Sequence, residues 1–132
     1  MIRVGLADDQ QLVRAGFGLV LDSQDDIAVQ WQAADGQEAC ELAESQPVDI
    51  ILMDVQMPVL DGLAATRAIR ALADPASQTP ILAVTAEAMP EDAARCLSAG
   101  MDGHLAKPIQ IAELAAALTR WLSSDQPPAM AV

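Results

Sequence analysis

Short apolar runs alternate along this chain with longer amphipathic stretches. Two runs, Ile50-Ile51-Leu52-Met53 and Ile81-Leu82-Ala83-Val84, are apolar at successive positions, which is typical of strands covered on both faces. The pattern predicts strands at 2–7, 27–33, 48–53, 80–84 and 103–106, and helices at about 10–22, 36–45, 62–73, 90–99 and 110–123. Five strand–helix units indicate an α/β fold, a doubly wound parallel sheet with helices on both faces.

Turn and capping residues agree with these boundaries. Asp35-Gly36 and Asp61-Gly62 stand at predicted helix starts, and Gly100 stands where a C-terminal cap is expected. We expect one domain over residues 1–123, followed by a flexible tail or the start of a linker at 124–132.

The polar residues that follow the apolar runs carry the candidate chemistry. They are Asp8-Asp9, Asp54, Thr85 and Lys107, the only lysine of the chain. The carboxyl ends of parallel strands meet at one edge of a sheet, and ligands of open α/β sheets bind outside that edge. We therefore expect three carboxylates, a hydroxyl and an ammonium group to form one site.

These groups fit phosphoryl transfer. Neighbouring carboxylates repel one another unless a cation joins them, and Mg2+ prefers carboxylate, water and phosphate oxygens. Asp54 is a candidate nucleophile, because a carboxylate can attack phosphorus and form an acyl phosphate. Thr85 and Lys107 are candidates for contacting the phosphoryl oxygens.

Composition and charge exclude several other classes. The chain is 52% hydrophobic, but no apolar stretch approaches the ~20 residues of a membrane helix, and its start lacks a signal-peptide layout. We therefore expect a soluble cytoplasmic protein with no membrane contact.

A net charge of −12 without a run of basic residues argues against direct nucleic-acid binding. Cys40 and Cys96 match no metal spacing, so we expect reduced thiols on helices.

Five of these motifs occur together in a familiar order: Asp8-Asp9, Met53-Asp54-Val55-Gln56-Met57-Pro58, Asp61-Gly62, Thr85-Ala86 and Lys107-Pro108. In order and spacing they resemble the response regulator receiver domains of two-component signalling, over residues 1 to about 123. The resemblance implies a flavodoxin-like five-stranded sheet of order 2-1-3-4-5. It also implies a phosphoryl-accepting switch, with a histidine kinase or a histidine phosphotransfer protein as the donor, and not an enzyme in the ordinary sense.

The resemblance further implies a role for each matching position. Asp54 would be the phosphoacceptor and a Mg2+ ligand, with Asp9 as a direct ligand, Asp8 acting through water and Gln56 offering its backbone carbonyl. Thr85 and Lys107 would sense the phosphoryl group. His104 stands where the family usually carries a switch aromatic residue, and activation would alter the surface of the fourth helix, fifth strand and fifth helix. Dimerisation on activation stays open.

The first helix is a candidate docking face for the partner. Gln11, Arg14, Ala15 and Gly18 share one face at helical spacing, opposite the expected packing residues Leu12, Gly16, Phe17 and Val20. Small side chains at 15 and 18 would allow a partner helix to approach closely.

Alternatives remain for the function and for single residues. A Mg2+-dependent phosphatase of the haloacid-dehalogenase type also uses an aspartyl nucleophile, but its second catalytic aspartate is replaced by Gln56. A flavodoxin-like cofactor carrier would need a Ser/Thr/Gly phosphate cradle after the first strand, where Asp8-Asp9-Gln10 stands. Asp8 or Asp9 alone is equally explained as a helix cap, and His104 as an inert histidine.

The output of the domain is a separate open question. The first half looks like receivers that precede a helix-turn-helix domain, and residues 85–108 look like receivers of hybrid histidine kinases. A fusion of two sources stays open.

Overall fold

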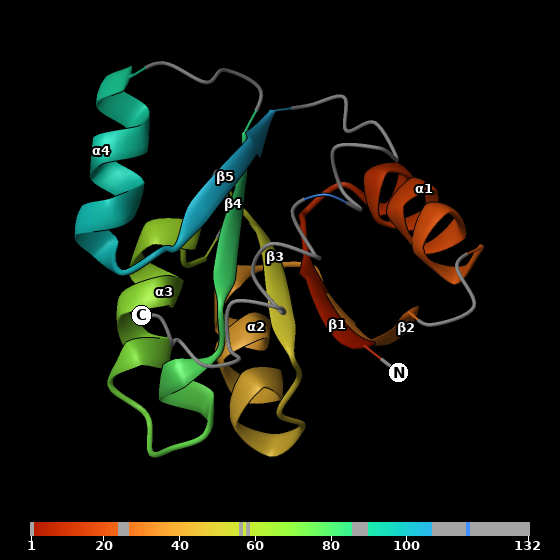
Figure 1. Ribbon diagram of the computed structural model, residues 1–132, viewed down its shortest axis with the longest axis horizontal. Coiled ribbons are helices and arrows are strands. Elements are labelled where there is room, and N and C mark those ends of the chain that lie inside the picture. The colour runs from red at the N-terminus through yellow and green to blue at the C-terminus, as the bar shows by residue number, and fades with distance from the viewer. Residues whose placement is uncertain are drawn as a thin grey trace.

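The computed structural model describes residues 2–23, 27–55, 57, 59–85, 90–106 and 116. Five parallel strands form one sheet of order β2-β1-β3-β4-β5, with helices on both faces (Figure 1). The strands are β1 (Ile2–Ala7), β2 (Ile27–Ala33), β3 (Ile50–Asp54), β4 (Ile81–Thr85) and β5 (Gly103–Ala106). The helices are α1 (Gln11–Asp22), α2 (Gly36–Ser45), α3 (Gly62–Arg70), the 3-10 helix η1 (Ala76–Gln78) and α4 (Pro90–Ala99). The expected fold class and strand order are confirmed.

Alternation along the strands divides the core into two layers. Ile50 and Leu52 of β3 belong to a buried cluster with Phe17 and Leu21 of α1. Ile51 and Met53 point to the other face, into a cluster lined by α2, α3 and α4. Because successive side chains of a strand point to opposite faces, an uninterrupted apolar run is what a strand between two helical layers requires.

Several boundaries differ from the sequence-based prediction. β3 begins at Ile50 instead of 48 and includes Asp54, and β4 is shifted by one residue toward Thr85. α3 ends at Arg70, three residues early, and η1 was not predicted. Leu72 N donates to Ile69 O at 3.0 Å, three residues back, so the α-helical pattern gives way to a tighter turn after Arg70. The predicted helix at 110–123 and the tail at 124–132 lie outside the described residues, apart from Ala116.

Side-chain caps fix the starts of two helices. Asp35 Oδ1 accepts a hydrogen bond of 2.8 Å from Glu38 N, and Glu38 Oε1 accepts one of 2.7 Å from Ala34 N. Asp35 is thus the N-cap of α2, and Glu38 holds the residue before the cap. Asp61 Oδ1 accepts from Ala64 N at 2.8 Å and caps α3 in the same way.

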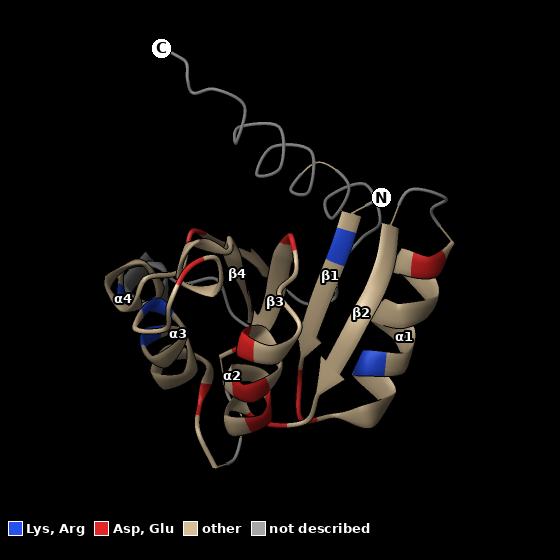
Figure 2. Ribbon diagram, turned by 90° about the horizontal axis from the view of Figure 1, so that it is seen from below, with Lys and Arg blue, Asp and Glu red and all other residues tan. Residues whose placement is uncertain are grey.

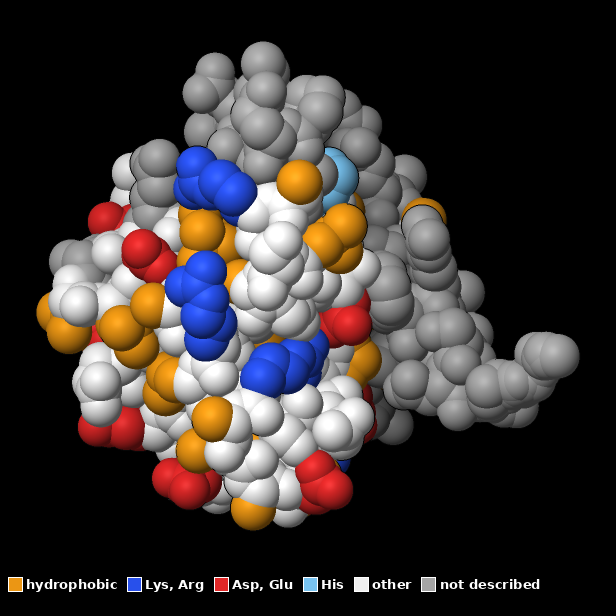
Figure 3. All heavy atoms as spheres, turned by 90° about the vertical axis from the view of Figure 1, so that its left-hand side faces the viewer, with side chains coloured by type: hydrophobic (Ala, Val, Ile, Leu, Met, Phe, Trp, Pro, Cys, Tyr) orange, Lys and Arg blue, Asp and Glu red, His pale blue; other side chains and the backbone are white. Residues whose placement is uncertain are grey.

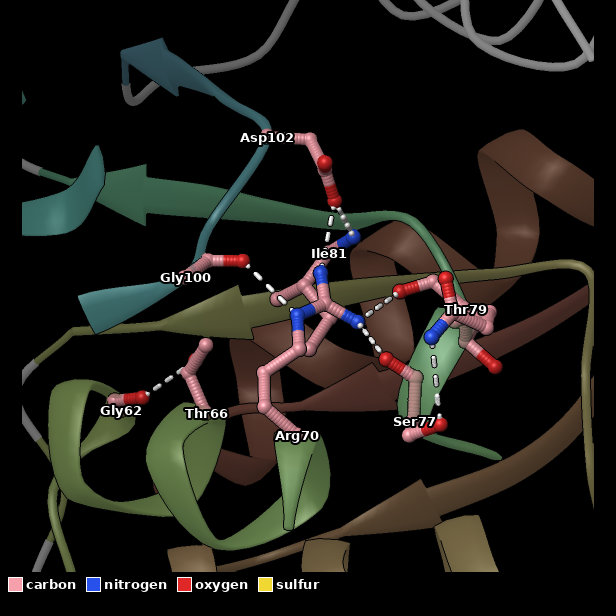
Figure 4. A network of polar contacts seen from close by, with 9 residues as sticks. Gly62, Thr66, Arg70, Ser77, Thr79, Ile81, Gly100 and Asp102 are labelled. Atoms are coloured by element: carbon pink, nitrogen blue, oxygen red, sulfur yellow. Dashed lines mark hydrogen bonds and ion pairs between the residues drawn. The ribbon is translucent and has the colours of Figure 1, made fainter. Parts of the chain in front are cut away.

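An arginine network braces the edge of the sheet where the strands begin (Figure 4). Arg70 Nε donates to Gly100 O at 2.9 Å, and its Nη1 donates to Ser77 O and Thr79 O at 2.9 and 2.7 Å. Its Nη2 lies 2.8 Å from Asp102 Oδ2. One guanidinium therefore joins the end of α3 to the loops that enter β4 and β5.

Basic side chains lie together on the surface formed by α3 and α4, although the chain as a whole is acidic (Figure 3). Arg67 and Arg70 occupy the last turn of α3, and the exposed Arg95 lies on α4.

No helix in the described part of the chain is long and apolar enough to cross a bilayer.

Candidate phosphoacceptor site

The candidate site lies at the carboxyl edge of the sheet. In Figure 2 acidic segments follow the end of β1 at this edge. Ala7 pairs with Met53, and Asp54 pairs with Val84. This register brings the ends of β1, β3 and β4 side by side, so residues far apart in the sequence meet there.

Three carboxylates come together at this edge. One oxygen from each of Asp8, Asp9 and Asp54 lies within 4.8 Å of the others. Asp8 is 1% exposed and Asp54 is 7% exposed, whereas Asp9 faces solvent. At an effective dielectric constant of about 20, two unit charges at such a distance repel by roughly 3 kcal/mol, and by less where water screens Asp9. The donor set therefore fits a hard divalent cation that prefers oxygen ligands.

Backbone contacts hold Asp8 in place. Its backbone N–H donates to Ala33 O on β2 at 3.0 Å, and its Oδ1 accepts from Gln10 N at 2.9 Å. Arg14 Nη1 donates to the Asp8 carbonyl at 2.5 Å. The sequence pattern placed Arg14 on an open docking face, but this half-buried side chain instead supports the site. No sequence signal indicates this contact, because it depends on how α1 lies against the strand edge.

Thr85 and His104 lie on neighbouring strands. Thr85 ends β4 and pairs with Ala106, and His104 pairs with Ala83. Since paired residues of parallel strands point to the same face, Thr85 and His104 share the α4 side of the sheet. Thr85 is half-buried, and the His104 side chain is exposed. Lys107, which follows directly on β5, and Gln56 lie outside the described residues.

The predicted docking face of α1 requires a correction. Gln11 and Ala15 are exposed as expected, but Gly18 is buried, and a Cβ there would lie 3.6 Å from Gln32 Nε2 on β2. Gly18 therefore faces the sheet and cannot contact a partner.

Of the four residues expected to pack inward, Phe17 is buried and Val20 is half-buried against the core, but the other two face outward. Leu12 is 86% exposed, and a Cβ on Gly16 would meet no atom within 4 Å. The buried large side chains of α1 are Phe17 and Leu21, which rotate the helix so that Leu12 and Gly16 face outward. Because α1 has apolar residues on two faces, the sequence pattern did not show which face packs against the sheet. The larger side chains select the inward face.

The cysteines belong to the core. Cys40 on α2 is half-buried and Cys96 on α4 is buried, and the Cys40 thiol donates to Ala65 O at 3.5 Å. Burial, together with the neighbouring Glu41 carboxylate, raises the pKa of the Cys40 thiol. The thiol therefore stays protonated at neutral pH, as expected of a packing residue.

Comparison with known proteins identifies the family. The profile of the response regulator receiver domain matches residues 4–119. This chain belongs to that family. A crystal structure of the receiver domain of sensor histidine kinase PA1611 from Pseudomonas aeruginosa superposes with a TM-score of 0.84 at 41% identity, covering 93% of this chain and 98% of that one. That structure is described as having a magnesium ion coordinated in its active site cleft.

Curated relatives include both kinds of receiver that the sequence resembles. Transcriptional regulatory protein LiaR of Bacillus subtilis is 38% identical over 128 residues, which are 96% of this chain and 58% of LiaR. Signal transduction histidine-protein kinase BarA of Escherichia coli is 45% identical over 86 residues, 65% of this chain and 9% of the kinase. The chain thus spans less than two thirds of these receiver-containing proteins. Receiver domains generally act as phosphorylation switches in two-component signalling with histidine kinases, and not as true enzymes.

Proposed function

We propose that this receiver domain accepts a phosphoryl group onto Asp54 from a phosphohistidine of a histidine kinase or phosphotransfer protein. A carboxylate oxygen of Asp54 attacks phosphorus, the P–N bond breaks as the new O–P bond forms, and the imidazole leaves with the electron pair. The product is an aspartyl phosphate on this chain. The observation that carries the proposal is the convergence of Asp8, Asp9 and Asp54 within 4.8 Å at the carboxyl edge of the sheet.

The same carboxylates are the proposed Mg2+ ligands. Asp9 and Asp54 would bind directly, Asp8 would act through water, and the backbone carbonyl of Gln56 would complete the protein's share. When bound, Mg2+ supplies neutralisation of the charge that gathers on the phosphoryl oxygens. The support is the chemistry of the donor set, three carboxylates that repel one another without a cation.

Thr85 and His104 are the proposed switch, with Lys107 as a second contact to the phosphoryl group. Thr85 would move toward phosphorylated Asp54, and the His104 ring would enter the space it leaves. The two side chains share one face of the sheet, and the exposed position of His104 fits the outward, unphosphorylated arrangement. The ring's new position would alter the surface around α4, β5 and the helix expected after it. Phosphorylation needs to bias this equilibrium by only a few kcal/mol.

The partner would dock on the outward face of α1. Leu12, Ala15, Gly16 and Leu19 are all exposed at positions i, i+3, i+4 and i+7. Two leucines would flank a central pair of small residues, which lets a partner helix approach the backbone closely. This face replaces the predicted one that contained Gly18.

Phosphorylation of variants tests the central claim. Wild-type protein treated with Mg2+ and acetyl phosphate should gain one base-labile phosphoryl group by intact-mass measurement, and Asp54→Asn should gain none. Asp61→Asn is the matched control, because Asp61 lies in the following loop and asparagine can also cap α3. Undiminished labelling of Asp54→Asn would refute the assignment of the phosphoacceptor.

The same samples test the switch. NMR of His104, the single histidine, should show its ring shifting from solvent to a protected position when beryllofluoride binds the wild type. A ring that stays exposed to solvent in both states would remove His104 from the switch.

A further inference from the structure

The loop between β3 and α3 is closed at its base against the phosphoacceptor. Val55 N donates to Val84 O at 3.3 Å, and Gly62 N donates to Val55 O at 2.8 Å. A Cβ on Gly62 would lie 2.3 Å from the Asp54 carbonyl oxygen, which is far too close for any side chain. The first residue of α3 therefore rests directly on the backbone of Asp54.

The first turn of α2 forms the outer wall of this loop. A Cβ on Gly36 would lie 1.9 Å from the Leu60 carbonyl oxygen and 2.7 Å from its carbonyl carbon. These are backbone atoms, so a side chain at position 36 would have to displace the loop itself. The hydrogen bonds that Asp35 and Glu38 accept fix the start of α2, which makes this wall rigid.

Val59 shows that the loop conformation is imposed by these anchors. Its φ is 68°, in the left-handed region that β-branched residues disfavour, and its side chain is 80% exposed. An exposed side chain gains little packing to offset this strain. Met57, two residues earlier, is buried in the core, so the loop is held on three sides while Val59 takes the strained conformation.

We propose that Gly36 is a positioning residue for the phosphoacceptor site, acting through the Leu60 carbonyl on the loop that follows Asp54. This inference rests on the proposed function, in which Asp54 accepts the phosphoryl group and binds the cation. A methyl group at position 36 must move Leu60 by about 1 Å to reach the 3.0 Å below which Cβ contacts are essentially never found. Leu60 stands two residues before Gly62, and Gly62 packs directly against the Asp54 backbone, so the displacement is carried toward Asp54.

The test is Mg2+ and beryllofluoride binding by Gly36→Ala, measured by NMR well below the unfolding temperature. We expect Mg2+ affinity to fall roughly tenfold or more, because misplacement by about 1 Å is costly at a preorganised site. Circular dichroism should show a retained fold. The matched control is Gln37→Ala, an exposed position in the same turn of α2, which should bind like the wild type.

A second substitution separates positioning from general destabilisation. Val59→Gly removes the restriction on φ, so the loop can adjust around a methyl group at position 36. In the Gly36→Ala background it should recover part of the lost Mg2+ affinity, which a merely structural defect in α2 would not allow.

The outcomes are distinct. If Gly36→Ala binds Mg2+ and beryllofluoride as tightly as Gln37→Ala, the positioning role is overturned. If Gly36→Ala does not fold, the comparison moves to the Val59→Gly background, where equal affinity with and without Gly36→Ala overturns it. Failure of the wild type and Gln37→Ala to bind would instead refute the proposed function.

Discussion

At the level of single residues, Asp8 and Asp9 contribute differently to the acidic cluster although they are neighbours in the chain. Asp8 is buried and one of its oxygens accepts from Gln10 N, whereas Asp9 is exposed. Asp8 thus combines a structural contact with its place in the cluster. Asp9 adds negative charge that only a cation would offset.

Separate substitutions should reveal this difference. Asp9→Ala should abolish most of the thermal stabilisation by Mg2+, and should stabilise the metal-free protein slightly by removing a repulsive charge. Asp8→Ala should weaken Mg2+ binding less, but should cost about 1 to 2 kcal/mol of metal-free stability, because Gln10 N loses its acceptor. Melting with and without Mg2+ measures both effects. Equal Mg2+ losses in the two variants would contradict direct binding by Asp9 and water-mediated binding by Asp8.

At the level of elements, α3 is tied to the loops before β4 and β5 by Arg70. The Arg70 side chain is 24% exposed and satisfies three carbonyl oxygens and the Asp102 carboxylate. Asp102 Oδ2 also accepts from Ile81 N at 2.8 Å. This brace lies at the strand edge opposite the acidic cluster, so it can hold the end of α4 while the site end changes.

Arg70→Met should therefore lower the free energy of unfolding by about 2 to 3 kcal/mol, because it removes the ion-pair partner of Asp102 and the side-chain donor to three carbonyl oxygens. Arg67→Met is the control, since Arg67 lies in the same turn of α3 but is exposed. This substitution should change the free energy of unfolding by no more than about 0.5 kcal/mol. Urea unfolding measures both. Similar small losses in the two variants would show that the network contributes little stability.

The outward face of α1 makes a prediction about phosphotransfer. Gly16→Arg should block transfer from autophosphorylated histidine kinases or phosphotransfer proteins, because a long side chain at an open position would hold a partner helix away. Labelling by acetyl phosphate should not change, since that small donor needs no docking face. Gln37→Arg adds the same charge on α2, on the other side of the sheet, and should affect neither assay. Parallel losses in both assays for Gly16→Arg would argue against docking on α1.

At the level of the whole molecule, the two ends of the strands have different tasks. The carboxyl end gathers Asp8, Asp9 and Asp54, and the opposite end carries the Arg70 network. Two helical layers bury the strands between these ends, so the sheet is a rigid support for both. The arrangement concentrates negative charge where a cation is proposed, and basic side chains gather on the α3–α4 side (Figure 3).

The sequence by itself determined the order of elements, the parallel sheet and the identity of the clustered carboxylates. Apolar runs that end in polar residues have one consistent solution, because parallel strands align their carboxyl ends. Ile51 and Leu52 must both be buried, so helices must cover both faces. These inferences use only local periodicity and the topology that it implies.

Tertiary structure alone decided the rotation of α1, the role of Arg14 and the contact between Gly36 and Leu60. The spacing of α1 allows two apolar faces, and the volumes of Phe17 and Leu21 against the sheet select one. The Gly36 contact joins the first turn of α2 to the loop before α3, and their approach depends on how α2 and α3 pack, which no residue pattern within either segment encodes. Local sequence specifies which groups reach the strand edge, but the fit between packed elements sets the positions from which they act.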